Sequence, residues 1–284
     1  MTTAEGFAPA KINLTLHVTG QRADGYHLLD SLVVFADVGD RLSYDAGPEM
    51  GVTVTGPFGP GVPLDRSNLV WTAAEACGWT GNIHLEKNLP HGAGIGGGSS
   101  DAAAVLRDLG GSAEKALGLG ADVPVCLSHA PQRMAGIGEV LAEVPTAPAL
   151  DLVLVNPGGH VPTPEVFKAL AVKDNPDMGD LPEFAGRESF LTWLGAQRND
   201  LEAPALALAP QINGALTALQ GADLVRMSGS GATCFGVFAN RAEAEAAAER
   251  IAMAHPEWWV VACRSFGGAA GQIPPRHQFK RSTT

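Results

Sequence analysis

The sequence is poor in the residues that mark several common classes of protein. Its four cysteines, Cys77, Cys126, Cys234 and Cys263, lie far apart in apolar stretches without a CxxC pair, which favours buried reduced thiols over disulfides. No apolar run approaches the length of a membrane span, and the first residues lack the basic and then apolar pattern of a signal peptide. We therefore expect a cytoplasmic protein with no membrane partner.

Basic residues are also scarce. The 19 lysines and arginines are outnumbered by 30 acidic residues, and the net charge is −11. This balance argues against a general nucleic-acid-binding protein, so we expect no nucleic-acid partner. Because the protein as a whole is negatively charged, its overall electrostatic potential does not attract an anionic substrate. Such a substrate must be bound by local groups, such as backbone N–H groups, a metal ion or a few well-placed lysines.

Glycine, in contrast, is concentrated in one stretch that is typical of a phosphate-binding loop. A half-buried strand is expected to end near Glu86, and Pro90 stops it. Five of the next eight residues are glycine, and Ser99-Ser100-Asp101 then opens an Ala- and Leu-rich helix. Because backbone without Cβ atoms can approach a ligand closely, and because a helix N-terminus attracts anions, we predict that this loop cradles phosphate.

Three other interpretations of this stretch fit less well. The spacing Gly92-x-Gly94-x-x-Gly97 matches a dinucleotide-binding fingerprint, but residues 88–91 separate the strand from the first glycine. A Walker loop would need lysine at position 98, where glycine stands. A flexible linker would not run directly into a capped apolar helix.

Two shorter stretches also carry candidate chemistry. In the expected strand at 6–19, Lys11 and Asn13 alternate with apolar residues, after a small, tight Ala8-Pro9-Ala10. Asp122 stands in a turn just before a proline, where turn chemistry alone is the common explanation. A second glycine loop at 227–235 precedes an apolar strand, and it lacks the glycine spacing of a hydrolase nucleophile elbow.

Strands and helices are mixed along the chain without regular βαβ alternation, which predicts an α+β fold. We expect further strands near 32–35, 41–45, 51–55, 133–137, 151–155 and 258–264. Helices are expected near 68–77, 99–109, 113–117, 188–196, 200–219 and 241–254, with a further helix starting at 162–165, capped by Thr163. The 284 residues suffice for two modest domains, and the Pro-rich connection at 145–148 predicts domains at 1–148 and 149–284.

Together, these stretches resemble the three motifs of the GHMP kinase superfamily, in the family's order. The first is Pro9-Ala10-Lys11-Ile12-Asn13-Leu14, the second runs through residues 89–103, and the third is Ser228-Gly-Ser-Gly-Ala. The resemblance implies a two-domain GHMP kinase fold with the active site in the cleft between the domains. It also implies ATP and Mg²⁺ as cofactors.

Further segments narrow the resemblance within that superfamily. The segments at 10–14, 20–27, 119–124 and 162–164 are similar to those of the kinases that act in the non-mevalonate isoprenoid pathway. This likeness implies ATP-dependent phosphorylation of the 2-hydroxyl of a small molecule, a cytidine-diphosphate-linked methylerythritol. It leaves open whether the protein is a monomer or a homodimer.

The resemblance also implies roles for individual residues. Asp122 would be the general base that takes the proton of the substrate hydroxyl, and Lys11 would keep it ionised and stabilise charge on the transferred phosphoryl group. Residues that would contact the cytidine-linked substrate are Asn13, Tyr26, His27, Thr163 and Phe167, with Tyr26 and Phe167 enclosing the cytosine ring. Residues that would bind ATP are Asn68, Lys87, Pro90, Gly92, Ala93, Gly94, Ile95, Gly96, Gly97, Gly98, Ser99 and Ser100. The metal ligands are not assigned, although Ser99 or Ser100 could touch Mg²⁺.

Two rival functions remain at this point. A kinase of the same superfamily for a smaller alcohol, such as homoserine or mevalonate, would lack the segment at 20–27 and the helix start at 162–164 as a cytidine site. A non-catalytic ligand sensor on the same fold would tend to lose the base or the glycine loop. This sequence keeps Lys11, Asp122 and all the glycines.

Overall fold

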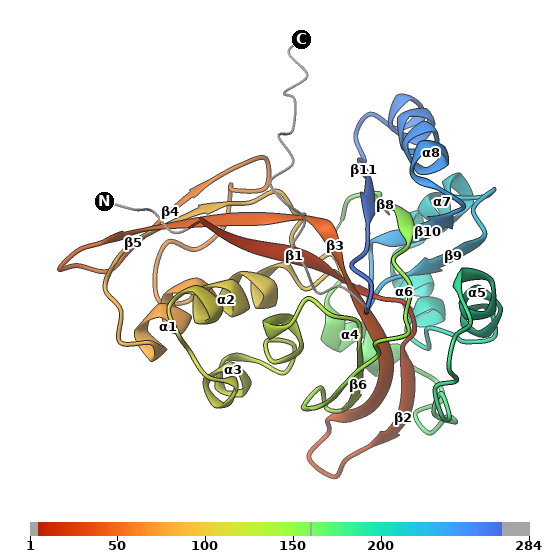
Figure 1. The fold of residues 1–284 in the computed structure, drawn as a ribbon, viewed down its shortest axis with the longest axis horizontal. Coiled ribbons are helices and arrows are strands. Elements are labelled where there is room, and N and C mark those ends of the chain that lie inside the picture. Colours follow the sequence, from red (N-terminus) through yellow and green to blue (C-terminus); the bar gives the residue numbers. More distant parts are fainter. Residues whose placement is uncertain (1–4, 160, 269–284) are drawn as a thin grey trace.

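The computed structural model describes residues 5–159 and 161–268. A seven-stranded sheet is built from the first half of the chain and a four-stranded sheet from the second half (Figure 1). Helices pack beside each sheet without a repeated βαβ pattern, which confirms the expected α+β class. In the described residues no helix combines the length and the apolar character needed to cross a bilayer.

The long strand β3 (His27–Ala46) organises the first sheet, because β1, β2, β5 and β6 all pair with it in antiparallel register. It merges the two short strands that were expected at 32–35 and 41–45. The remaining strands of this sheet are β1 (Glu5–Asn13), β2 (His17–Gln21), β4 (Gly51–Thr55), β5 (Gly81–Glu86), β6 (Gln132–Gly136) and β7 (Val140–Glu143).

Three helices lie against one face of the first sheet (Figure 1): α1 (Leu69–Ala76), α2 (Gly97–Asp108) and α3 (Ala113–Leu119). The side chains of Ala102, Ala103 and Ala104 in α2 are fully buried. Their small size lets α2 pack closely on β1 and on α1. The glycine loop is therefore fixed at one end by a strand, β5, and at the other by a buried helix.

The second sheet has the order β11-β8-β10-β9, and every neighbouring pair is antiparallel. Its strands are β8 (Asp151–Asn156), β9 (Leu224–Met227), β10 (Cys234–Phe238) and β11 (Trp259–Arg264). All residues of β8 and β10 are buried, as continuous apolar strands in the middle of a sheet should be. The helices of this half are α4 (Thr163–Ala169), α5 (Arg187–Gly195), α6 (Glu202–Leu208), α7 (Gln211–Ala218) and α8 (Arg241–Ala254).

The two halves share part of their apolar core. Ile12 and Leu32 of the first sheet belong to the same buried cluster as Leu152 and Phe235 of the second. The chain also returns to the first sheet after β11, where the N–H of Phe266 donates to the carbonyl of Phe35 at 2.8 Å. This continuous packing fixes the groove between the two sheets, in which the candidate site lies.

Some local expectations were wrong. The strand expected at 6–19 is interrupted between Asn13 and His17, where the N–H of Leu16 bonds to the carbonyl of Arg198 at 2.9 Å. The single helix expected at 200–219 is two helices, because Pro210 breaks it. Thr163 does not cap α4 through its side chain, since its hydroxyl lies 2.7 Å from that of Ser230.

Candidate active site

Lys11 is held at the inner edge of the groove by the irregular end of β1. The register between β1 and β3 shifts between Pro9 and Lys11, and the N–H of Lys11 leaves the β3 ladder to donate to the carbonyl of Ile95 at 2.9 Å. The glycine loop thus joins the first motif by a backbone hydrogen bond. The side chain of Lys11 is only 4 % exposed, so its amine needs a nearby partner.

Asp122 supplies that partner. Its Oδ2 lies 2.8 Å from Nζ of Lys11, and its side chain remains 44 % exposed. The turn that carries it is fixed on both sides, since the N–H of Val123 donates to the carbonyl of Gly120 and Gln132 donates to the carbonyl of Val125. The structure therefore unites the two predicted catalytic residues and leaves the carboxylate open to the cavity.

The helix after the glycine loop begins earlier than expected. Gly96, with a φ of 66°, precedes the first helical residue Gly97, so Ser99-Ser100-Asp101 does not open the helix. Ser100 donates to the carbonyl of Pro9 at 2.8 Å, and no side chain caps the helix. The N–H groups of the first turn, which have no partners within the helix, remain available to an anion at this end.

The glycines of the loop fulfil two different requirements. A Cβ on Gly94 would lie 2.4 Å from the backbone oxygen of Ser228, so this glycine permits close contact with the third motif. A Cβ on Gly98 would meet nothing within 4 Å. Space at the start of α2 is therefore open, as a phosphate cradle requires.

The third motif closes the groove from the second half of the chain. Ser228 accepts a hydrogen bond from the N–H of Asn13 at 3.1 Å and donates to the carbonyl of Gly94 at 2.9 Å. One hydroxyl thus connects all three motifs. The sequence places Ser228 in the third loop but gives no sign of this role, because the partners of Ser228 are distant along the chain.

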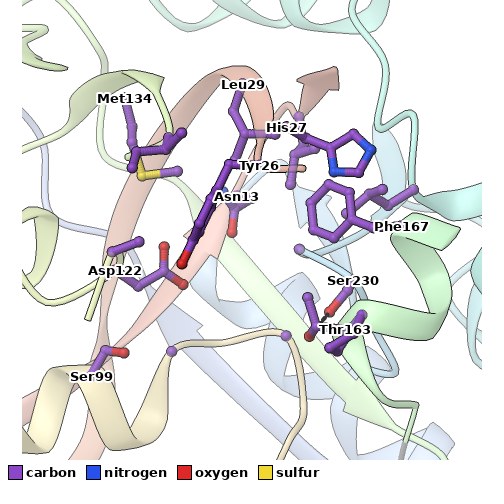
Figure 2. Close-up of a pocket in the computed structure, with 18 of the residues that line it drawn as sticks. Asn13, Tyr26, His27, Leu29, Ser99, Asp122, Met134, Thr163, Phe167 and Ser230 are labelled. Carbon is purple, nitrogen blue, oxygen red and sulfur yellow. Dashed lines mark hydrogen bonds between the residues drawn. The ribbon is translucent and has the colours of Figure 1, made fainter. Parts of the chain in front are cut away.

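A cavity of about 910 Å³ runs between the two halves (Figure 2). It brings together most of the predicted site residues, namely Lys11, Asn13, Tyr26, His27, Gly92, Ala93, Gly94, Gly96, Gly97, Gly98, Ser99, Asp122, Thr163 and Phe167. Ile95 and Ser100 are buried behind the loop and do not line it. Ser99 and Asp122 lie at one end and His27 and Phe167 at the other, while Tyr26 lies between them with its hydroxyl turned toward Asp122 (Figure 2).

Two aromatic rings stack at the end of the cavity away from Asp122. His27 and Phe167 stack with centroids 4.7 Å apart and an angle of 21° between the rings, while Tyr26 is 59 % exposed (Figure 2). Burial and the charge of Lys173 lower the pKa of His27, so the ring is neutral near pH 7. Lys168 and Lys173 also line the cavity and add positive charge to a protein that is acidic overall.

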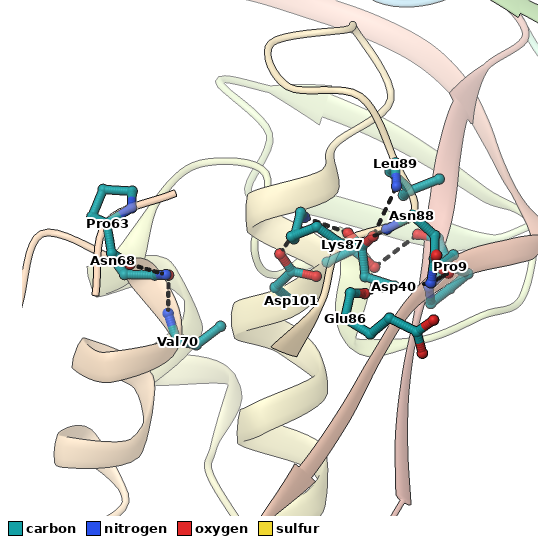
Figure 3. Close-up of polar contacts among 12 residues, drawn as sticks. Pro9, Asp40, Pro63, Asn68, Val70, Glu86, Lys87, Asn88, Leu89 and Asp101 are labelled. Atoms are coloured by element: carbon teal, nitrogen blue, oxygen red, sulfur yellow. Dashed lines mark hydrogen bonds and ion pairs between the residues drawn. The ribbon is translucent and has the colours of Figure 1, made fainter. Parts of the chain in front are cut away.

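A second cavity of about 390 Å³ adjoins the glycine loop and is lined by Asn68, Lys87 and Pro90. Asn68 caps α1 by accepting from the N–H of Val70 at 3.1 Å and donates to the carbonyl of Pro63 at 2.8 Å (Figure 3). Gly97 and Gly98 line both cavities. A nucleotide whose phosphates lie at α2 therefore has space for its base beside Asn68.

Lys87 takes part in a buried ion cluster under the glycine loop (Figure 3). Its amine pairs with Asp40 and with Asp101, the latter at 2.6 Å, and Asp40 also accepts from the N–H groups of Asn88 and Leu89. Burial and the neighbouring Asp40 raise the pKa of Asp101, whereas the two carboxylates raise the pKa of Lys87. One proton on Asp101 leaves the cluster neutral, which is the form that burial favours.

No group of three or more His, Cys, Asp or Glu residues suited to a metal occurs among residues 5–159 and 161–268. Ser99 and Asp122 are among the oxygen donors that line the main cavity near the glycine loop. Mg²⁺ in phosphoryl-transfer sites is held by one or two protein oxygens together with phosphate and water. The donors present therefore fit a metal ion carried in with a nucleotide.

Two family models match the chain, and together they define its class. The GHMP kinases N terminal domain matches residues 68–128, and the GHMP kinases C terminal domain matches residues 174–255. The chain belongs to the GHMP kinase family.

Individual relatives agree with this class. A protein of Paracoccus denitrificans is 55% identical over 95% of this chain and 97% of its own length, and one of Dinoroseobacter shibae is 58% identical over 90% and 92%. Both are named 4-diphosphocytidyl-2-C-methyl-D-erythritol kinase. The crystal structure of a 4-(cytidine 5'-diphospho)-2C-methyl-D-erythritol kinase matches with a TM-score of 0.74 and 36% identity, over 93% of this chain and 100% of that chain.

Similarity to other kinases of the family is more remote. Homoserine kinase from Cytophaga hutchinsonii superposes with a TM-score of 0.66 at 17% identity, over 95% of this chain and 96% of that one. At this level of identity the match supports the fold alone.

Proposed function

We propose that this protein transfers the γ-phosphoryl group of ATP to the 2-hydroxyl of 4-diphosphocytidyl-2-C-methyl-D-erythritol, a step in the non-mevalonate route to isoprenoid precursors. The contact between Lys11 and Asp122, at the end of a glycine loop and inside a cavity with rings at its other end, is the observation that carries the proposal. The names of the relatives supply the substrate.

In the proposed reaction Asp122 accepts the proton of the 2-hydroxyl while the hydroxyl oxygen attacks the γ-phosphorus. The bond between that phosphorus and the β,γ-bridging oxygen breaks, and ADP leaves. Lys11 holds the carboxylate in place by its 2.8 Å contact, and its charge stabilises the transferred phosphoryl group. The N–H groups at the start of α2 hold the phosphates.

The substrate residues are assigned from their places in the cavity. Tyr26 and the face of Phe167 that is turned away from His27 would enclose the cytosine ring, since flat heterocycles bind between aromatic side chains. His27 and Thr163 would contact the cytidine or its diphosphate. Asn13 would bind the methylerythritol end, because it lies two residues from Lys11 in β1.

The nucleotide residues are assigned in the same way. The loop from Gly92 to Ser100 would enclose the ATP phosphates, and Asn68, Lys87 and Pro90 would border the adenine in the second cavity. Ser99 would contribute an oxygen to Mg²⁺, since the hydroxyl of Ser100 is committed to Pro9. The ion would screen phosphate charge.

The remaining expectations complete the proposal. The protein would act in the cytoplasm as a monomer or homodimer, without a nucleic-acid partner. Its ATP-binding domain would comprise residues 1–148, and the second domain would comprise residues 149–284. The connection between β7 and β8, at 144–150, supports a boundary there, because the strands on either side of it belong to different sheets.

The direct test compares ATP turnover with three acceptors: the cytidine-linked methylerythritol, homoserine and mevalonate. We expect the cytidine-linked substrate to be phosphorylated with a kcat/KM at least ~100-fold higher than that of either small alcohol, since only it reaches the ring end of the cavity. Equal or better use of a small alcohol would overturn the choice of substrate. ATP binding without turnover of any acceptor would favour a ligand sensor.

A further inference from the structure

Asn199 bonds to the backbone on either side of Ser228, whose hydroxyl connects all three motifs, although Asn199 does not line the cavity. The short segment 198–200 fills the interruption between β1 and β2, where the N–H of Leu16 donates to the carbonyl of Arg198 and the N–H of Asp200 donates to the carbonyl of Leu16. The segment thus pairs with Leu16, just after the strand that carries Lys11 and Asn13. Asn199 is buried, with 8 % of its surface exposed.

The side chain of Asn199 is fully engaged. Its Nδ2 donates to the carbonyls of Met227 and Gly229, both at 2.8 Å, and its Oδ1 accepts from the N–H of Leu201 at 3.0 Å. The two donated bonds hold the backbone of the third motif on either side of Ser228. An amide is the appropriate group here, because only a side chain with both donors and an acceptor satisfies these partners.

The third motif in turn packs closely against the glycine loop. Ser228 donates to the carbonyl of Gly94, and a Cβ on Gly229 would lie 2.7 Å from that same oxygen. Beyond this contact the N–H of Thr233 donates to the carbonyl of Ala93 at 3.1 Å. A shift of Gly229 would therefore move Gly94 and, with it, the N–H groups that follow at the start of α2.

We propose that Asn199 is a positioning residue for nucleotide binding, which acts through the carbonyls of Met227 and Gly229 to fix the glycine loop against the third motif. The proposal concerns the nucleotide side of the site. It rests on the proposed function only in taking ATP as the phosphoryl donor. It assigns Asn199 no contact with either substrate.

The Asn199→Asp variant separates this role from a local structural one. Aspartate keeps the acceptor for the N–H of Leu201 at the start of α6, but it cannot donate to Met227 and Gly229 and brings a negative charge toward their carbonyls. If Asn199 served only to start α6, Asn199→Asp would bind ATP as the wild type does. If it positions the glycine loop, Asn199→Asp and Asn199→Ala should both bind ATP weakly.

The experiment measures the ATP dissociation constant by calorimetry for the wild type, Asn199→Asp, Asn199→Ala and Ile251→Ala. Ile251 is buried in α8 away from the cavity, so its truncation is a matched control for lost stability. We expect the dissociation constant to rise about tenfold or more in both Asn199 variants and to stay within about twofold of wild type in Ile251→Ala. All variants are measured at a temperature at which circular dichroism shows them folded.

Wild-type affinity in Asn199→Asp, or an equal loss in Ile251→Ala, would overturn the positioning role. Because the measurement needs no acceptor alcohol, it is independent of the choice of substrate. A wild-type protein that binds ATP but does not phosphorylate the cytidine-linked alcohol would refute the proposed function and leave this inference intact.

Discussion

The amine of Lys11 and the carboxylate of Asp122 lie 2.8 Å apart, although one is carried by β1 and the other by a turn that follows α3. The amine is buried and the carboxylate is 44 % exposed. The pair is therefore fixed on its protein side and open on its cavity side. A hydroxyl that enters the cavity would meet a carboxylate that is already oriented by a cation.

Replacing Gly98 tests the phosphate cradle. A Cβ at this position meets no protein atom within 4 Å, so Gly98→Val should fold normally while its side chain occupies space beside the free N–H groups of α2. We expect the ATP dissociation constant, measured by calorimetry, to rise at least about tenfold.

Gly118 offers a matched control for that substitution. It stands in α3, and a Cβ there also meets nothing within 4 Å, but it does not line either cavity. Gly118→Val should leave ATP affinity unchanged. Unaltered affinity in Gly98→Val would contradict the cradle assignment.

From the ion cluster of Lys87 we predict a large loss of stability for one substitution and almost no change for another. Lys87→Met removes the cation that pairs with both buried carboxyl groups and should lower the free energy of unfolding by about 3–5 kcal/mol. Asp101→Asn replaces a carboxyl group whose raised pKa already favours its neutral form, so it should change that free energy by less than about 1 kcal/mol.

Urea unfolding of the two variants measures these effects. Lys115 is exposed, so Lys115→Met serves as the control for loss of a lysine. We expect its free energy of unfolding to stay within about 0.5 kcal/mol of that of the wild type. A stable Lys87→Met would show that the cluster does not depend on its cation. A large loss in Asp101→Asn would show that Asp101 is ionised in the folded protein.

From the buried environment of His129 we predict that the protein loses stability in acid. It packs between Phe35 and Phe266, and burial together with the charge of Arg107 lowers its pKa to about 4. The unfolded chain takes up a proton near pH 6.5 and the folded chain only near pH 4, so the contribution is complete above about pH 6.5 and is lost as the pH falls toward 4. At pH 5 this loss is about 2 kcal/mol.

Urea unfolding at pH 7 and pH 5 checks this prediction in the wild type and in His129→Phe. Phenylalanine keeps a ring between Phe35 and Phe266 and cannot be protonated, so the variant should lose about 2 kcal/mol less over this interval. The pKa values of His17 and His27 are also lowered, so the free energy of unfolding of His129→Phe should still fall somewhat between pH 7 and pH 5. An unchanged difference in His129→Phe would show that other groups carry the acid sensitivity.

The sequence predicts most strongly what depends on local pattern. The apolar runs of β8 and β10 and the Ala-rich helix α8 follow from neighbouring residues, and the structure confirms them. The alternation at 6–19 predicts a strand there, but β1 ends at Asn13 and is buried on both faces from Ala8 onward. The first motif carries Lys11 and the segment 119–124 carries Asp122. Their contact follows from the resemblance to the kinase family rather than from local pattern, and the two groups do lie 2.8 Å apart.

Features that depend on distant partners could not be predicted in this way. Ser100 was expected at the helix start, yet its hydroxyl donates to the carbonyl of Pro9 in β1. The hydroxyl of Thr163 likewise bonds to that of Ser230, which is distant along the chain. The two bonds that Asn199 donates carry no local signal, because their acceptors, the carbonyls of Met227 and Gly229, are brought to it only in the folded chain. Such residues are found from hydrogen bonds and burial rather than from spacing.

The most direct test of the catalytic account is the single-turnover rate of phosphoryl transfer from ATP to the cytidine-linked alcohol in Asp122→Asn. The amide keeps the size of the side chain but cannot accept the hydroxyl proton as a carboxylate does. We predict a rate at least ~100-fold below that of the wild type, with ATP affinity within about twofold. A rate near that of the wild type would contradict the assignment of Asp122 as the general base.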